Sequence, residues 1–378
     1  MFRLLINAGS ARTGGGSTHI EQLLRAMLET ESDLLVTVYL SRDSAARVSR
    51  DRRVNVVRVR SRWRLVTDLI RVPWASRRFD AVFTLGGAGS LWTCGRHIVY
   101  QGNALDYDNV YWRPRHSRAV LRFWSDWTAR NAALVCVPSV FLRDRLQAVA
   151  PSIYSGRVRV LPIGVTAPAA AWVEVPRADG PGRARAICGS SVAGVRDLLY
   201  VGSALPHKNV GLLFELARLW QPTDYEISLW LTISMDEANA MGYSTLSTDA
   251  RKRIHLLGTL SHEAICEMYR EVDALVIPSR LESFGQPVAE ALMSGCRCAL
   301  SAIPAFQELA GEYASYFRPD SVESLVQAVV ECLARPRPEL SEAEIWSRSS
   351  VNEAATLLGI IMQTSVASDM SSRAAAQE

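Results

Sequence analysis

The chain has 378 residues, enough for two domains of ordinary size, and its 48% apolar content indicates a globular protein with large cores. It has no run of about 18 apolar residues, so we expect no transmembrane helix. Its apolar start is too short for a secretion signal, so we expect none. Seven scattered cysteines favour a reducing cytoplasm over a disulfide scaffold. Cys296 and Cys298 have no second Cys or His pair at zinc spacing beside them, so we assign no metal.

The net charge of +4 conceals a division between the two halves of the chain. Residues 1–165 contain 25 arginines, no lysine and 12 acidic residues, which gives a net charge of +13. Residues 166–378 contain 17 basic and 26 acidic residues, which gives −9. A basic half joined to an acidic half predicts that the first half meets something anionic.

Strand-like and helix-like stretches alternate along the first half, which predicts a parallel sheet covered by helices on both faces. Ala, Pro, Gly and Arg then dominate residues 166–194, which we interpret as a linker or mobile loop. The expected strands of the first half are 3–7, 34–40, 54–59, 81–85, 98–101, 133–138 and 158–163, with amphipathic helices at 17–28 and 117–130.

The same alternation resumes in the second half. Two α/β domains of similar size are therefore expected, with the ligand at the carboxyl ends of the strands and between the domains. Strands are expected at 198–201, 228–234, 254–257, 275–277 and 297–301, and helices at 210–220, after a cap at Ser261, and at 325–335 after a cap at Asp320 or Ser321. We place an N-terminal acceptor-binding domain at 1–165, the linker at 166–194, a nucleotide-sugar-binding domain at 195–345, a C-terminal helix that packs back toward the N-terminal domain at 346–364, and a disordered tail at 365–378.

Three loops combine features that suit an anionic ligand. The loop after the first strand has three consecutive glycines, 14–16, which let backbone N–H groups approach a ligand closely, although a flexible turn is the alternative. Lys208 is one of only two lysines in the chain and lies at a helix start, where a cation opposes the helix dipole unless an anion is bound. A compact ammonium is suited to a diphosphate, and the alternative is a solvated surface lysine.

The third loop joins a buried-looking strand at 274–277 to a helix with Pro287 in its first turn. Glu282 lies just before that helix and Glu290 about one turn inside it. The helix N-terminus attracts phosphates. A carboxylate beside it would repel a phosphate, so its presence suggests that it binds another group, such as sugar hydroxyls. The alternative is an exposed acidic helix end.

Together these segments resemble the family-4 retaining glycosyltransferases of GT-B fold, whose two-glutamate motif has seven residues between the glutamates, as Glu282 and Glu290 do. The resemblance covers most of the chain and implies two Rossmann-like, doubly wound domains facing across a cleft. The matching segments, in the family's order, are 14–16, 206–209, 258–262, 278–285 and 294–296.

The resemblance also implies roles for individual residues. The two catalytic residues would be Lys208, which would bind the donor diphosphate, and Glu282, which would hold the transferred sugar. Glu290 would accept hydrogen bonds from the nucleotide ribose. The implied mechanism retains configuration and uses no metal or cofactor, because lysine and the helix dipole stabilise the leaving phosphate. The other donor-binding residues implied are Ser203, Thr259, Leu260, Ser283, Phe284 and Gly285, and the acceptor or phosphate side comprises Gly15, Gly16, Gln101 and Asn103.

The chain departs from the family pattern in two places. Many relatives have an arginine shortly before the lysine, where this chain has 203–205 without one. The second diphosphate cation is therefore absent or comes from elsewhere, with Arg280 and Arg12 as candidates. Many also have a histidine after the fifth strand, where this chain has Gln101 and Asn103. His19 and His97 are further candidates, although structural roles are the alternative for both.

Arginines are interleaved with tryptophans and aliphatic residues within 58–78, and arginines and tryptophans occur together again within 112–127. This combination suits the headgroup zone of an anionic membrane, and the alternative is ordinary helices with solvated Arg and buried Trp. Nucleic acid is not expected as a partner, because no binding module is recognisable and the second half is acidic.

The sequence therefore predicts a hexosyltransferase that uses a nucleotide-diphospho-sugar, with a preference for the GDP-mannose type and UDP-sugars open. The acceptor would be a glycan or a polyprenyl-linked glycan in bacterial surface polysaccharide assembly, such as O-antigen, lipopolysaccharide or exopolysaccharide. The enzyme would be cytoplasmic, peripheral on the inner face of the membrane. The alternatives are a sugar-nucleotide epimerase of similar fold and an inactive nucleotide-binding scaffold for a partner transferase.

Overall fold

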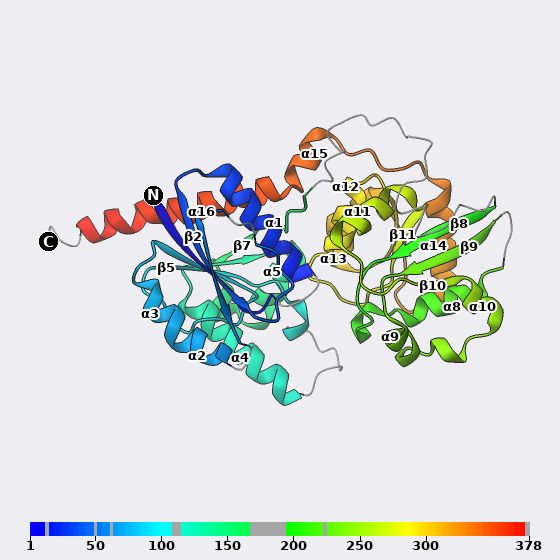
Figure 1. The fold of residues 1–378 in the computed structure, drawn as a ribbon, viewed down its shortest axis with the longest axis horizontal. Coiled ribbons are helices and arrows are strands. Elements are labelled where there is room, and N and C mark those ends of the chain that lie inside the picture. The colour runs from blue at the N-terminus through cyan, green and yellow to red at the C-terminus, as the bar shows by residue number, and fades with distance from the viewer. Residues whose placement is uncertain are drawn as a thin grey trace. The chain divides into compact units, whose positions relative to one another are not determined.

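The computed structural model describes residues 1–11, 15–48, 51–60, 63–107, 115–166, 194–221 and 225–374. The chain divides into two compact units, one formed by Met1–Thr166 with Trp346–Glu378 and the other by Ala167–Ile345 (Figure 1). Most of the expected linker at 166–194 lies outside the described residues.

The first unit is built on a seven-stranded parallel sheet with the strand order β3-β2-β1-β4-β5-β6-β7. Its central strands β1 and β4 are almost completely buried, as expected for a parallel sheet with helices on both faces. The order reverses between β1 and β4, so the loops after these strands diverge to opposite sides. The strands are β1 (Phe2–Ala8), β2 (Leu34–Ser41), β3 (Val54–Val59), β4 (Ala81–Leu85), β5 (Arg96–Tyr100), β6 (Leu134–Val137) and β7 (Val158–Val160).

The helices of the first unit include one from the far end of the chain, because α16 packs against α1 and β5 (Figure 1). Apolar residues of α16, among them Leu357 and Ile361, belong to the same buried cluster as Leu23 of α1 and Ile6 of β1. The helical segments are α1 (Gly15–Thr30), α2 (Arg64–Val66), η2 (Thr67–Arg71), α3 (Val72–Ser76), η3 (Ala104–Asp106), α4 (Arg115–Asn131), α5 (Val140–Val149), α6 (Pro151–Tyr154) and α16 (Ser350–Ala374). α16 therefore continues past residue 365, where the sequence had predicted a disordered tail.

A buried polar link fixes the start of α16 to the first unit. The carboxylate of Glu353 is 2.7 Å from Nε2 of His19 and accepts the backbone N–H of Gly164 at 2.8 Å. Gly164 lies so close to the backbone of Ser349 and Ser350 that a Cβ there would come within 2.4 Å of the Ser349 oxygen. His19 thus has a structural partner, which is the alternative that the sequence left open for it.

The second unit contains a six-stranded parallel sheet with the order β10-β9-β8-β11-β12-β13. Its strands are β8 (Val195–Tyr200), β9 (Glu226–Leu231), β10 (Ile254–Leu256), β11 (Ala274–Ile277), β12 (Arg297–Ser301) and β13 (Ala314–Phe317). Its helical segments are η4 (Pro206–Lys208), α8 (Gly211–Leu219), α9 (Met235–Ala240), η5 (Tyr243–Thr245), α10 (Thr248–Lys252), α11 (His262–Glu271), α12 (Gln286–Met293), α13 (Pro304–Ala310), η6 (Gly311–Tyr313) and α14 (Val322–Ala334), and α15 (Glu342–Ser347) leads toward α16.

The expected pair of parallel α/β sheets is confirmed. The strands predicted from buried apolar runs are present, with ends displaced by a few residues, and Ser261 caps α11 by accepting the N–H of Ala264. Ser321, and not Asp320, caps α14. The edge strand β13 was not predicted.

Replacing Glu353 with alanine should destabilise the first unit. The substitution leaves two buried donors, on His19 and Gly164, without their acceptor, and we expect a loss of about 3 kcal/mol in the free energy of unfolding. The urea midpoint measures this loss. Glu29→Ala, which removes an exposed i,i+4 pair with Arg25, should change it by less than about 0.5 kcal/mol, and equal midpoints for the two variants would contradict the role of Glu353.

Candidate active site

The candidate site of the second unit lies where its strand order reverses. β8 and β11 are neighbours, while β9 and β12 lie on their outer sides. Ligands of open α/β sheets bind outside the carboxyl ends of the strands at such a point, because the two adjacent loops diverge and leave room. The loops after β8 and β11 carry Lys208 and Glu282, the two residues expected to be catalytic.

The loop after β8 is held by contacts that fix its backbone. The Tyr200 hydroxyl donates to the backbone oxygen of Ser203 at 2.8 Å. Asn209 adopts the left-handed conformation, with φ of 56°, and its side-chain N–H donates to the oxygen of Pro319 at 2.7 Å. The short helical turn η4 between these anchors ends at Lys208, so the position of this ammonium group is set by the loop.

Lys208 and Glu282 form an ion pair. Nζ of Lys208 lies 2.6 Å from Oε1 of Glu282, and the side chains are 20% and 14% exposed. The Ser279 hydroxyl donates to the same oxygen at 2.8 Å, and the backbone N–H of Arg280 donates to His207 at 2.8 Å across the two loops. The contacts bring residues 74 positions apart into one half-buried cluster of opposite charges.

Glu290 lies inside α12 and is almost fully buried, with 7% exposure. It accepts hydrogen bonds from the Tyr269 hydroxyl at 3.2 Å and from Gln286 at 3.3 Å, and Nδ1 of His262 is 3.8 Å away. Burial raises the pKa of Glu290 to about 7, although the two hydrogen bonds act in the opposite direction. This carboxyl group therefore changes charge near neutral pH in the ligand-free protein.

Gly285 sets the geometry at the start of α12. Its φ of 107° is unfavourable for a residue with a side chain, and a Cβ would lie 2.7 Å from a ring carbon of Phe306. Gln286 and Pro287 follow as the first helical residues. A glycine is thus required where the loop turns into the helix, between Glu282 and Glu290.

The other expected donor-binding residues lie along the same edge of the sheet. Phe284 is buried and Ser283 half-buried in the loop after β11, while Ser203 is exposed in the loop after β8. Thr259 is exposed and Leu260 half-buried between β10 and α11. Their contact with a donor stays a prediction.

The residues expected on the acceptor side belong to the first unit. Gly15 and Gly16 are the exposed first residues of α1, while Gly14 lies outside the described part. The buried side chain of Gln101 donates to the Tyr107 hydroxyl at 2.8 Å, and Asn103 caps η3 by accepting the N–H of Leu105 at 3.1 Å. Both amide side chains thus have local structural bonds, and their contact with an acceptor stays a prediction.

The structure places two of the three remaining candidates for a positive charge, His97 and Arg280. His97 is buried beside the Thr84 hydroxyl at 2.8 Å, and burial lowers its pKa to about 4, so it is neutral at physiological pH. Arg280 forms an exposed ion pair with Asp320 at 2.8 Å. Arg12 lies outside the described residues. The source of a second cation for a diphosphate stays a prediction.

Sequence reasoning missed the residues that support the two glutamates. The sequence placed Ser279 in the loop after β11 but did not predict that its hydroxyl donates to Glu282. Tyr269 and Gln286 lie on the faces of α11 and α12 that surround Glu290. Gln286 occurs four residues before Glu290, a spacing that places both on one helix face and could have identified it.

The thermal stability of the ligand-free protein should depend on Glu290 near neutral pH. Because the folded pKa of about 7 lies above the ordinary 4.5, the stabilisation by the proton is complete below about pH 4.5 and is lost as the pH rises through 7. We expect the Tm of the wild type to fall relative to that of Glu290→Gln between pH 5 and 8. A Tm difference that stays constant across this range would contradict the raised pKa, and Glu331→Gln on the surface is the matched control.

Comparison with known proteins identifies a glycosyl transferase domain in this part of the chain. Residues 191–348 match the family model for glycosyl transferases group 1. The serotype-specific mannosyltransferase WbdA of Escherichia coli is 28% identical over 189 residues, which are 47% of this chain and 22% of the relative. The O-antigen chain mannosyltransferase RfbU of Salmonella typhimurium is 28% identical over 131 residues, 35% of this chain and 36% of the relative. The matches thus span well under half of the length of these relatives.

Among solved structures, sucrose-phosphate synthase from Thermosynechococcus elongatus superposes with a TM-score of 0.72 at 15% identity, covering 97% of this chain and 100% of that chain. The likeness extends over both parallel-sheet units and shows that the fold is GT-B. The domain at residues 191–348 thus matches the group 1 glycosyl transferases.

Proposed function

We propose that the chain is a retaining, metal-independent glycosyltransferase that moves a hexose from a nucleotide-diphospho-sugar to a glycan or lipid-linked acceptor in bacterial surface polysaccharide assembly. The observation that carries the proposal is the ion pair of Lys208 and Glu282 at the reversal point of the second sheet. The names of the matched relatives support mannose as the transferred sugar, and that of RfbU supports an O-antigen acceptor. We propose GDP-mannose as the type of donor.

The ion pair explains how an anionic donor and a carboxylate share one site. Alone, Glu282 would repel a diphosphate, but the ammonium of Lys208 lies 2.6 Å from it and neutralises it. A bound diphosphate would compete for the same ammonium, and Ser279 keeps a hydrogen bond on the carboxylate as that happens. Glu282 is then free to accept hydrogen bonds from sugar hydroxyls.

The leaving group would be stabilised by charges already fixed in place. Transfer leaves a nucleoside diphosphate, and preorganised positive charge at that position lowers the barrier more than any flexible group could. Lys208 supplies a point charge, and the backbone N–H groups at Ser283–Gly285 together with the start of α12 supply the dipole. We therefore assign no metal to this step.

Glu290 would hold the nucleotide ribose. A ribose diol offers two hydroxyl donors, which favour the ionised carboxylate over the protonated one. Since burial alone raises the pKa of Glu290 to about 7, binding of a nucleotide should lower that pKa and release a proton at neutral pH. Tyr269 and Gln286 fix the carboxylate in the orientation that the diol meets.

Two substitutions test the proposed reaction. Glu282→Ala and Lys208→Ala should each lower turnover of the nucleotide-sugar by roughly 100-fold or more, because each removes a charge from the reacting centre. Purified protein is assayed with GDP-mannose or UDP-glucose as the donor and a polyprenyl-linked glycan as the acceptor, and chromatography measures the released nucleotide. Glu312→Ala, an exposed glutamate of the same unit, is the matched control, and circular dichroism checks the fold.

Three other outcomes of these assays would indicate a different function. Unchanged donor turnover in Glu282→Ala would contradict the assignment. Conversion of the donor sugar without release of nucleotide would identify an epimerase. Binding of GDP or UDP with no turnover by the wild type in the presence of donor and acceptor would identify a scaffold.

We also propose that the first unit binds an anionic membrane surface. Large apolar side chains that are 38% to 65% exposed gather on two helical regions, and we call them the Trp–Arg surface. The regions are side by side, because Arg64 of α2 lies over the Trp124 ring of α4 at 5.8 Å (Figure 1). The surface consists of Trp63, Leu65, Leu69, Ile70, Trp74, Val120, Phe123 and Trp127, with Arg71, Arg77, Arg78 and Arg130 exposed on the same helices.

The predicted tryptophans therefore divide between two roles. Trp124 is structural, because its indole N–H donates to the oxygen of Gly89 at 2.7 Å. Trp63, Trp74 and Trp127 are exposed, and Arg78 lies over the Trp74 ring at 5.0 Å. No helix in the described ranges is long and apolar enough to cross a membrane. Exposed aromatic and basic side chains together suit the headgroup zone, where each basic residue adds roughly 1 kcal/mol.

Liposome flotation tests the Trp–Arg surface. The wild type should float with vesicles that contain 30% phosphatidylglycerol at physiological salt and should not float with pure phosphatidylcholine, because the arginines require anionic headgroups. Ile70→Ser with Trp74→Ser should lower the bound fraction at least severalfold, whereas Trp346→Ser, an equally exposed tryptophan elsewhere, should not. Equal flotation of all variants, or none by the wild type, would remove this proposal.

A further inference from the structure

Three side chains on one face of α11 lie around the buried Glu290. α11 and α12 pack side by side in the second unit (Figure 1). His262, Cys266 and Tyr269 are spaced by four and three residues, which places them on the same face of α11. Tyr269 donates to Glu290 from one end of this face, and His262 lies at the other end, where the helix begins.

His262 faces two partners through its two ring nitrogens. Nδ1 lies 3.8 Å from Oε1 of Glu290, and Nε2 lies 3.6 Å from Sγ of Cys266. The His262 side chain is 31% exposed, whereas Glu290 is almost fully buried. The imidazole is therefore the member of this pair that solvent reaches more easily.

Cys266 can satisfy the imidazole in either of its protonation states. Burial raises the pKa of the Cys266 thiol to about 12, so the group is an uncharged S–H at neutral pH. A thiol is both a weak donor and a weak acceptor, so it can donate to a neutral ring nitrogen or accept from a protonated one. The contact with Cys266 therefore holds the ring in place without fixing its charge.

The position of His262 links its charge to that of Glu290. His262 is the first residue of α11, where the helix dipole opposes a positive charge unless an anion faces it. Glu290 is that anion when it is ionised, and it is the only charged residue among the described residues Gln286–Met293 of α12. Tyr269 stays a neutral hydroxyl, because burial raises its pKa well above the ordinary value. The other charged residues of α11 are Glu263, Glu267, Arg270 and Glu271.

A bound nucleotide shifts this pair in one direction. In the empty site, burial favours the protonated form of Glu290. The proposed function places a ribose diol on Glu290, and hydroxyl donors favour the ionised carboxylate. The carboxyl proton then leaves Glu290 as the ribose binds. An imidazole lies beside it, and this is the side chain whose charge changes most readily near neutral pH.

We propose that His262 is a positioning residue of the nucleotide site, which takes up a proton when the ribose binds and then holds the ionised Glu290 by a charged contact. Glu290 loses one proton and the imidazole gains one, so the proton stays within the pair. The inference rests on the proposed transferase function, for which it names the residue that keeps nucleotide affinity steady across neutral pH. His262 acts through Glu290 and not on the reacting atoms.

Calorimetric titration of the full chain with GDP and with UDP tests this coupling. Heats measured at pH 7 in Hepes and in Tris, which differ in ionisation enthalpy, give the number of protons released per bound nucleotide. His262→Gln should release roughly half a proton more than the wild type, because a carboxyl group with a pKa of about 7 is half protonated at this pH. The terminal phosphate of the nucleotide titrates in the same range, and its contribution cancels in the comparison.

The pH dependence of affinity separates this role from a purely structural one. In His262→Gln the proton of Glu290 must pass to solvent, so the ratio of its Kd to that of the wild type should rise roughly fivefold from pH 8 to pH 6. A loss of packing alone would change this ratio equally at both pH values. His255→Gln is the matched control, because His255 is a half-buried histidine of the same unit that stacks on Trp230, and it should behave as the wild type does.

The outcomes distinguish this inference from the function on which it rests. Equal proton release by the wild type and His262→Gln, or a Kd ratio that does not change with pH, would overturn the inference and leave the transferase standing. Binding of neither nucleotide would overturn both. Should His262→Gln fail to fold, NMR of the wild type with ¹³C-labelled histidine replaces it. One histidine should then change from the neutral to the charged chemical shift on nucleotide binding at pH 7, and no such change would overturn the inference.

Discussion

Charge neutralisation between two loops is the constraint on which the second domain's site depends. Lys208 and Glu282 come from different strands, and only the reversal of strand order between β8 and β11 brings their loops together. Under the proposed function, a carboxylate that binds sugar hydroxyls and a cation that binds phosphate have to coexist within a few ångströms. Their pairing keeps the empty site electrically balanced, and Asn209, Ser279 and the Arg280–His207 backbone bond hold the loops in register.

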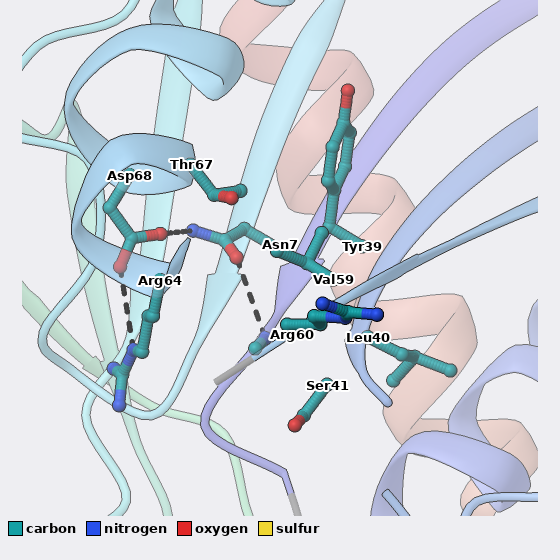
Figure 2. Close-up of a pocket in the computed structure, with 10 residues that line it drawn as sticks. Asn7, Tyr39, Leu40, Ser41, Val59, Arg60, Arg64, Thr67 and Asp68 are labelled. Atoms are coloured by element: carbon teal, nitrogen blue, oxygen red, sulfur yellow. Dashed lines mark hydrogen bonds and ion pairs between the residues drawn. The ribbon is translucent and has the colours of Figure 1, made fainter. Parts of the chain in front are cut away.

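Each unit also buries a carboxyl group close to the carboxyl ends of its strands. Glu290 has two long hydrogen bonds and a pKa raised to about 7 by burial. Asp68 accepts the Asn7 side-chain N–H and forms an ion pair with Arg64 (Figure 2), and burial still raises its pKa. In both groups the cost of removing a carboxylate from water exceeds what its partners return.

The fold was predictable because parallel strands that are buried on both faces are continuous apolar runs, as in β4 and β11. Lys208 was identified because lysine is rare in this chain and this one lies at a helix start, and Glu282 and Glu290 were identified from their positions around the start of one helix. The contacts of Tyr269 and Asp68 were not predicted, because they join segments that are 21 and 61 residues apart. β13 was missed because it is a four-residue edge strand without alternation, and the local roles of Gln101 and Asn103 depend on a turn that the sequence does not show.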